Sequence, residues 1–334
     1  MKKAHSSDLR RLRVSALTQW LNMLGIYALL LALFLAGMCI SPKFATPENL
    51  LNVLRNVTLL GIVALGVAFI TYSRHYVDLS IPSMMALSGF VAITALPLGF
   101  VPSLLCGLLA GIVVGAINGY MIGYWRVNPI IWTLAMVFML DGILRWAYGG
   151  NQIYPDNGTP AGAAFLQLSQ IVVFKFLPLP TLLLLVLVVV MHWLMKHTRF
   201  GAQVQLTGSA NEVARLSGVP VARVVWLTFI LSAFTTALAG ILLTSMNKQG
   251  TFETGQGYDF NSVTAVVLGG ISLAGGRGKL LGVLGGVLVI GVLLNLMTLL
   301  GLGSFLQLVV KGLVFIVVVG LTSWFGRRSG RSNV

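Results

Sequence analysis

Polar side chains inside long apolar runs are the residues of this chain whose types could do chemistry, because a polar group there is costly unless it is paired or used. Asn118 and Asn295 lie in such runs and could meet a hydroxyl-rich solute, although hydrogen bonding between helices explains them equally well. Asp78 and Ser80 stand just before another apolar run. Asp78 there either caps the following helix or contributes a polar group to a solute pathway. These four residues are therefore candidates for a polar pathway.

The sequence lacks the signatures of soluble catalytic sites. The run from Gly275 to Lys279 resembles a phosphate-binding loop, but Leu273 takes the place of its first glycine and Leu280 that of its Ser or Thr. The four histidines are scattered and no HExxH pattern occurs, which argues against a zinc site. No paired acids and no nucleophile with a base are found. We expect a protein that is not an enzyme and that binds no cofactor or metal itself.

The composition indicates an integral membrane protein. Of the 334 residues, 57% are hydrophobic and 9% are charged, and the mean hydropathy is +0.92. A soluble globular domain has about 25% charged residues. The formal net charge of +14 comes from basic residues in short segments between apolar runs, where they set membrane topology. A nucleic acid partner is therefore not expected.

The apolar runs predict an all-α membrane protein with about ten transmembrane helices, since one span needs about 20 mostly apolar residues. Together they would form a single transmembrane domain over residues 1–334. The predicted spans are 20–40, 50–72, 81–97, 101–123, 128–148, 178–195, 224–246, 261–276, 281–300 and 305–325.

The basic residues orient these spans. With a cytoplasmic N-terminus, 16 of the 22 Lys and Arg residues fall in inside segments, as the positive-inside rule requires. Both the N- and C-termini are then cytoplasmic. On this topology spans 2–5 and 7–10 run in opposite directions, which is the arrangement that an inverted repeat requires. The repeat is a hypothesis that rests on these directions.

Two loops between the spans are long. The outer one, residues 149–177, is rich in Gly, Pro and Asn and is predicted to form a small periplasmic cap. The inner one, residues 196–223, has helix-forming residues over 211–216, between Gly208 and Gly218. It predicts a short helix on the cytoplasmic side.

Two interruptions fall within the apolar region. Residues 73–82 join the second and third spans, and the eighth span is short and broken by glycines. Irregular backbone at membrane depth is kept only where protein buries it or a wet cavity adjoins it. We expect the broken span beside the translocation path or at a moving helix contact, where close backbone approach requires a missing Cβ. The glycines concerned are Gly269, Gly270, Gly275 and Gly276.

Two segments closely resemble permeases of ribose-type carbohydrate ABC importers. Residues 265–282 (AVVLGGISLAGGRGKLLG) resemble the signature of that family, and residues 207–219 (TGSANEVARLSGV) resemble its cytoplasmic loop. Residues 78–80 resemble the acidic element before the family's third span. The likeness extends from about residue 20 to 325 in spacing and motif order.

One departure from the family surrounds that acidic element. The family usually has a Gly-rich stretch before it and Val-Gly after it. This chain has Ser73-Arg74-His75-Tyr76 before it and Ile81-Pro82 after it. Bulk replaces flexibility here, so local backbone geometry and substrate preference are not carried over.

The resemblance implies a pore subunit of the bacterial inner membrane that receives a sugar from a periplasmic substrate-binding protein. A cytoplasmic ATP-binding subunit would bind ATP and Mg²⁺ and drive transport, and a second permease copy or a paralogue would complete the pore in membrane lipid. The inner-loop helix would dock on the ATPase. The coupling residues expected from the resemblance are Gly208, Asn211, Glu212, Ala214, Arg215 and Gly218.

Other functions stay open at this point. Within ABC importers the solute could instead be a nucleoside, an autoinducer or an amino acid. An ion-coupled secondary transporter is the chief alternative. It needs a buried carboxylate or a histidine relay near the membrane midplane, whereas the acids of this chain lie in loops or near span ends. A membrane-embedded enzyme is the third possibility.

Overall fold

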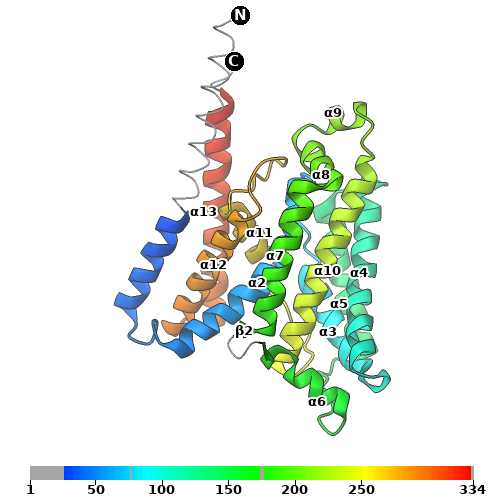
Figure 1. The fold of residues 1–334 in the computed structure, drawn as a ribbon, viewed down its shortest axis with the longest axis vertical. Helices are drawn as coiled ribbons and strands as arrows, with labels where there is room; N and C mark the ends of the chain where they lie inside the picture. Colours follow the sequence, from blue (N-terminus) through cyan, green and yellow to red (C-terminus); the bar gives the residue numbers. More distant parts are fainter. Residues whose placement is uncertain (1–25, 76, 174–176, 332–334) are drawn as a thin grey trace, which may run out of the picture.

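The structure, a computed structural model, describes residues 26–75, 77–173 and 177–331 and is predominantly helical (Figure 1). An N-terminal helix covers Ile26–Ile40. The other elements are α2 (Pro47–Tyr72), α3 (Ile81–Thr94), η1 (Leu96–Leu98), α4 (Phe100–Gly123), α5 (Pro129–Ala147), α6 (Pro160–Gln167), η2 (Leu168–Gln170), β1 (Val172–Val173), β2 (Leu177–Pro178), α7 (Leu179–His197), α8 (Arg199–Ser209), α9 (Asn211–Leu216), α10 (Val221–Asn247), α11 (Tyr258–Leu268), α12 (Gly282–Leu299) and α13 (Ser304–Arg331).

Each of the ten predicted spans overlaps one helix, and the protein is a multi-pass membrane protein. Among the described residues, six helices are long and apolar enough to cross a membrane: α2, α4, α5, α7, α10 and α12. Three shorter apolar helices cover Ile26–Ile40, α3 and the Phe305–Gly320 part of α13. The count of about ten spans, the inverted repeat and the cytoplasmic placement of both termini stay predictions.

The eighth predicted span, residues 261–276, is broken as expected. Its helix α11 ends at Leu268, and irregular backbone follows from Gly269 until α12 begins at Gly282. Gly270 has φ of +86°, a conformation that L side chains adopt only at a cost and that cannot continue a right-handed helix. The helix therefore stops at the glycine pair.

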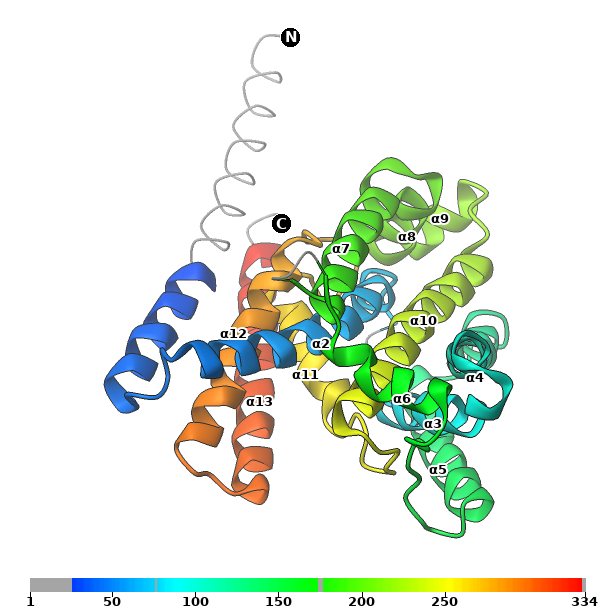
Figure 2. The same cartoon turned by 60° about the horizontal axis from the view of Figure 1, so that its bottom comes forward.

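The helices α2 and α10 form the centre of the protein. In α2, 83% of the most apolar 18-residue window is buried, against 22% in α5. Figures 1 and 2 show α2 between α12 on one side and α7 and α10 on the other, and α10 also contacts α3 and α4. The outer face of α5 carries exposed apolar side chains such as Phe138 and Trp146. That face is suited to lipid or to another membrane protein.

Small residues let α4 and α10 approach closely. A Cβ added at Gly111 would lie 2.6 Å from Ala237 Cβ, and one added at Gly119 would lie 2.8 Å from the Trp226 carbonyl oxygen. In a membrane, where lipid removes the hydrophobic drive between helices, such backbone approach supplies the packing energy. The contact holds α4, and with it Asn118, against the central pair of helices.

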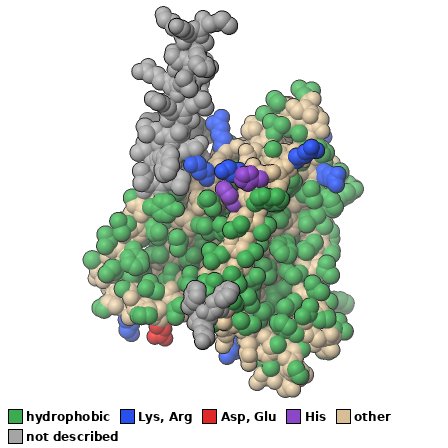
Figure 3. Space-filling model, viewed as in Figure 1, with side chains coloured by type: hydrophobic (Ala, Val, Ile, Leu, Met, Phe, Trp, Pro, Cys, Tyr) green, Lys and Arg blue, Asp and Glu red, His purple; other side chains and the backbone are tan. Residues whose placement is uncertain are grey.

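The two ends of the protein differ. Figure 3 shows hydrophobic side chains over most of one face, and most of the visible Lys and Arg side chains near the end that carries α8 and α9. The opposite end carries the loop 149–177, which contains α6, η2 and the antiparallel β1–β2 pair. In that loop Ile153 pairs with Gly250. The assignment of these ends to cytoplasm and periplasm follows from the positive-inside rule and stays a prediction.

Candidate functional site

A buried chain of hydrogen bonds joins three of the four predicted polar residues. Asp78 Oδ1 accepts hydrogen bonds from the Ser80 N–H at 2.9 Å and the Ser80 hydroxyl at 2.5 Å. The Asn118 amide donates to Ser80 Oγ at 2.9 Å, and Trp132 Nε1 donates to Asn118 Oδ1 at 3.0 Å. The chain therefore links the segment before α3 to α4 and α5.

The carboxyl group of Asp78 is buried and only partly hydrogen-bonded. Its side chain is 1% exposed, and its Oδ2 atom is buried without a hydrogen-bond partner among the described residues. It does not cap α3, because Ser80 occupies the N-cap position and Asp78 binds Ser80 itself. The capping interpretation of Asp78 is therefore wrong in detail. Burying a carboxyl group with only one of its oxygens hydrogen-bonded costs free energy.

The fourth polar candidate, Asn295, lies elsewhere. On α12 it exchanges two hydrogen bonds with Asn49, at 3.0 and 2.8 Å, and Asn49 also donates to the Phe44 carbonyl. Asn49 stands near the start of α2, whereas Asp78 follows the end of α2. Asn295 is thus occupied by an amide pair that ties α12 to α2. Its interhelical interpretation is the better one.

Sequence reasoning missed Trp132, the end of the hydrogen-bond chain. It stands one turn into α5, after Asn128, whose side chain accepts hydrogen bonds from the N–H groups of Ile130 and Ile131. A tryptophan near the end of a span usually lies at the membrane interface. Nothing in its sequence position marked it as a partner of Asn118.

The glycines of the broken span act in two different ways. At Gly269 an added Cβ would lie 2.6 Å from the Val283 Cα, so close backbone approach requires glycine there. At Gly270 an added Cβ would meet no atom of the described residues within 4 Å, and the requirement is the positive φ instead. The expected close approach therefore applies to Gly269 and not to Gly270.

Gly208, Gly275 and Gly276 meet around the carbonyl group of Tyr72, and we call this contact the glycine junction. Gly276 N–H donates to the Tyr72 carbonyl at 2.9 Å. A Cβ added at Gly208 would overlap that same oxygen and would lie 2.6 Å from Gly276 N. The junction joins the end of α2, the end of α8 and the broken segment 269–281. It brings together Gly208, which was expected among the coupling residues, and Gly275 and Gly276, which were expected in the broken span.

The predicted inner-loop helix is present as α9 (Asn211–Leu216). A second helix of the loop, α8, was not predicted. Its signal was Thr198, whose side chain caps α8 by accepting the Gly201 N–H at 3.2 Å. The loop therefore contains the predicted helix and, before it, a second one.

The expected coupling residues divide into buried and exposed ones. Ala214 is 0% exposed and Gly208 is fixed in the glycine junction, so both face the protein itself. Glu212 and Arg215 are exposed. The apolar Val213 and Leu216 are 52% and 88% exposed. The outer surface of α9 thus carries two charges and two apolar side chains that no described residue covers.

No group of three or more His, Cys, Asp or Glu side chains that could hold a metal ion occurs among the residues the structure describes. The polar groups of the hydrogen-bond chain, Asp78, Ser80 and Asn118, are buried, are bonded to one another and include a single carboxylate.

Several curated proteins are similar to this chain over most of its length. The ribose import permease protein RbsC of Bacillus subtilis is 35% identical over 301 residues, covering 90% of this chain and 92% of that protein. The L-arabinose ABC transporter permease protein AraH of Azospirillum brasilense is 34% identical, covering 90% and 87%. RbsC of Escherichia coli is 30% identical, covering 90% and 93%. No solved structure gives a match.

The match to a family model covers the same region. Residues 49–319 match the family described as "Branched-chain amino acid transport system / permease component". This range includes both runs that carried the resemblance, residues 207–219 and 265–282, and the relatives include ribose and arabinose permeases. The chain belongs to this permease family, as the resemblance predicted.

Proposed function

We propose that this chain is the transmembrane pore subunit of an ATP-driven importer that takes up a ribose-type monosaccharide delivered by a periplasmic binding protein. The substrate class is inferred from relatives named for ribose and arabinose. The protein would act in the bacterial inner membrane with a cytoplasmic ATP-binding subunit and a second permease copy or paralogue. A nucleoside, autoinducer or amino acid importer is the nearest alternative.

The observation that carries the proposal is the exposed outer surface of α9. Val213 and Leu216 are three residues apart, so they lie on neighbouring positions of one helix face, and Glu212 and Arg215 flank them. Exposed apolar side chains rimmed by charges are typical of a protein interface. We assign this surface to the ATPase. Gly218 has φ of +76°, and no atom in the described part of the chain lies within 4 Å of an added Cβ, so it permits the sharp exit of the chain after the helix.

The glycine junction supplies a route for motion from α9 into the membrane. Because α8 directly precedes α9, a displacement of α9 by the ATPase would also move the end of α8. At this end Gly208 contacts Tyr72 and Gly276. The ends of α2 and of the broken segment would move with it. ATP binding can shift the inward and outward states of the pore only if the ATPase binds α9 differently in the two states.

Asp78 favours a second candidate, an ion-coupled secondary transporter. Its buried carboxyl group with a free oxygen is the kind of intramembrane acid that proton-coupled carriers use. On our proposal it instead holds the start of α3 through Ser80. The two functions differ in their energy source.

Uptake into proteoliposomes distinguishes these functions. We expect ribose uptake by the permease only when the ATPase, ATP and the binding protein are present, and no effect of an uncoupler. Uptake that persists without the ATPase and stops with the uncoupler would show that the protein is a secondary transporter. Uptake of a nucleoside or an amino acid in place of ribose would correct the substrate class.

Charge reversal tests the assignment of α9. Glu212→Lys should weaken ATPase association or uncouple hydrolysis from uptake, with membrane insertion intact. The matched control is Glu253→Lys, which reverses an exposed acid in the loop before α11 and should leave ATPase association unchanged. Cysteines introduced at positions 210–216 should crosslink to the ATPase. Normal coupling of Glu212→Lys without crosslinks would place the contact elsewhere.

A further inference from the structure

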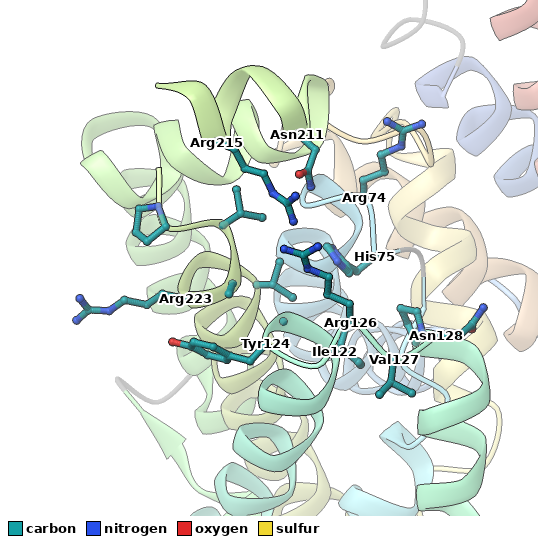
Figure 4. Close-up of a pocket in the computed structure, with 16 residues that line it drawn as sticks. Arg74, His75, Ile122, Tyr124, Arg126, Val127, Asn128, Asn211, Arg215 and Arg223 are labelled. Carbon is teal, nitrogen blue, oxygen red and sulfur yellow. The ribbon is translucent and has the colours of Figure 1, made fainter. Parts of the chain in front are cut away.

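A cavity of about 930 Å³ opens beside α9 (Figure 4). Its wall is built from three segments: the connection between α2 and α3, the connection between α4 and α5, and the stretch from α9 into α10. The volume is that of a small-molecule site. Of the residues that line the cavity, the proposed function uses Arg215 alone.

The cavity is strongly basic. Arg74, Arg126, Arg215 and Arg223 line it, and none of its 16 lining residues is acidic. In Figure 4 Arg126 and Arg215 point toward the same space, with Asn211 beside them, while Arg223 points away. Neither Arg126 nor Arg215 forms an ion pair with a described residue. Two guanidinium groups that converge without a carboxylate repel each other, and an anion between them would remove this repulsion.

The backbone conformation at Arg126 indicates that this position requires the arginine side chain itself. Arg126 has φ of +56°, and Arg74 has φ of +68°. Among the described residues, Lys248 is the one other residue besides glycine with positive φ. A glycine would adopt this conformation at little cost. An arginine held there is the kind of local strain that persists at functional positions.

Apolar side chains form another part of the wall, among them Ile122, Val127 and Val221. A ligand that fills the cavity therefore has an organic part as well as a negative charge. Arginine is suited to phosphate, because its planar fork of donors can bind two phosphate oxygens at once. His75 also lines the cavity. Its Nδ1 lies 2.8 Å from the Ser73 carbonyl oxygen, so Nδ1–H donates there and Nε2 is left for a ligand.

We propose that this cavity binds the phosphate group of an organic molecule, with Arg126 and Arg215 as charge partners and Asn211 as a hydrogen-bonding partner. Two sources carry this chemistry at the end of the protein that is predicted to be cytoplasmic: the headgroup of an anionic phospholipid and a soluble phosphate monoester. Because Asn211 and Arg215 belong to α9, the bound phosphate would tie α9 to the α4–α5 connection. The site then sets the position of the helix that we assign to the ATPase.

The test uses the full-length permease in lipid nanodiscs without the ATPase, so its outcome does not depend on ATP-driven transport. In one arm, nanodiscs of phosphatidylcholine are titrated with glucose 6-phosphate by calorimetry. In the other, the permease is extracted from vesicles of phosphatidylcholine and phosphatidylglycerol, and retained lipid is measured by native mass spectrometry. Saturable binding of the sugar phosphate identifies the soluble source, and retained phosphatidylglycerol identifies the lipid source.

The variant that removes the site is Arg126→Gln with Arg215→Gln. The matched control is Lys196→Gln with Arg199→Gln, which removes the same charge from two exposed positions outside the cavity, at the end of α7 and the start of α8. We expect the first pair to bind the probe at least about tenfold more weakly, and the control to stay within about twofold of the wild type.

If the first pair does not fold, Arg215→Glu tests the same site from an exposed position on α9. It should also weaken binding at least about tenfold, because it places an acid beside the phosphate. Equal weakening by the control pair would show that net charge alone matters and would overturn the proposal. Absence of binding in both arms would overturn it as well.

Discussion

The side-chain amide of Asn118 on α4 donates a hydrogen bond of 2.9 Å to the hydroxyl of Ser80 at the start of α3. Both residues are 0% exposed. Asn118→Ala would leave Ser80 Oγ without this donor and Trp132 Nε1 without an acceptor. We expect it to lower the free energy of unfolding of the detergent-solubilised permease by about 1–3 kcal/mol.

A double-mutant cycle isolates that hydrogen bond. Ser80→Ala and Asn118→Ala should be non-additive by about 0.5–3 kcal/mol, because they remove the same contact. The control pairs Asn118→Ala with Thr159→Ala, which removes the cap of α6. Its two effects should add within about 0.5 kcal/mol. Additivity in the Ser80 cycle would show that the contact contributes no stability.

The glycine junction predicts a large effect of one methyl group. Gly208→Ala would drive its Cβ into the Tyr72 carbonyl, and backbone atoms cannot rotate away as a side chain can. We expect a loss of about 1–3 kcal/mol in the free energy of unfolding and a loss of coupled uptake. The control is Gly142→Ala in α5, where an added Cβ meets none of the residues that the structure describes within 4 Å. It should be neutral or stabilise by up to about 1 kcal/mol. Equal effects of both variants would contradict the close contact between Gly208 and the Tyr72 carbonyl.

At Gly270 the cost of a substitution should depend on the backbone conformation that the new residue can adopt and not on the size of its side chain. Since an added Cβ at Gly270 would meet no described atom within 4 Å and its φ is +86°, the cost of substitution comes from the backbone conformation. Gly270→Leu should destabilise by about 1–2 kcal/mol and lower uptake. Gly270→Asn should cost less, because asparagine adopts positive φ more readily. Thermal unfolding of the two purified variants measures the difference. A larger loss for asparagine than for leucine would contradict this explanation.

The helices could be predicted from the sequence because their signal is local. Runs of about 20 apolar residues have one stable state in lipid, and each of the ten predicted spans overlaps an observed helix. The short helix over Asn211–Leu216 was also predictable, since Gly208 and Gly218 mark its limits. The break after Leu268 followed from adjacent glycines.

The partners of individual polar residues were not predictable, because they depend on which helices become neighbours. Asp78 and Ser80 are two residues apart in sequence, yet Asn118 joins them only because α4 packs beside α3. Asn295, like Asn118, is a polar residue inside a long apolar run, but it pairs with Asn49. The contact between Gly208 and Gly276 likewise needs the full fold. A pattern of residue types identifies candidates, and the packing of helices decides which of them meet.

Asp141 and Arg145, four residues apart on α5, form an ion pair. Arg145 Nε lies 2.9 Å from Asp141 Oδ2, and the two side chains are 50% and 42% exposed. An exposed pair of this kind contributes about 0–1 kcal/mol. Asp141→Asn should therefore change the free energy of unfolding by less than about 1 kcal/mol. Arg145→Ala should cost more, because Arg145 also stacks 4.6 Å from the ring centroid of Phe252. A larger loss for Asp141→Asn in chemical unfolding would overturn this order.

His75 predicts a loss of stability in mild acid. Burial lowers the pKa of His75 below its ordinary value of 6.5, and the hydrogen bond to the Ser73 backbone opposes this only in part. Since the unfolded chain takes up a proton near pH 6.5 and the folded chain only at lower pH, the unfolded state binds more protons in that window. The stability contributed by neutral His75 is therefore full above pH 6.5 and is lost as the pH falls below it.

The variant His75→Asn removes the titrating group and keeps an N–H donor for the Ser73 carbonyl. Between about pH 7.5 and about pH 5.5, the wild type should lose more unfolding free energy than this variant, measured by denaturant titration at constant ionic strength. Above about pH 7.5 the two proteins should show the same dependence on pH, because neither carries a titrating group at position 75 there. The same slope for both proteins below pH 6.5 would mean that His75 takes up its proton equally in the folded and unfolded states, and that its burial does not favour the neutral imidazole.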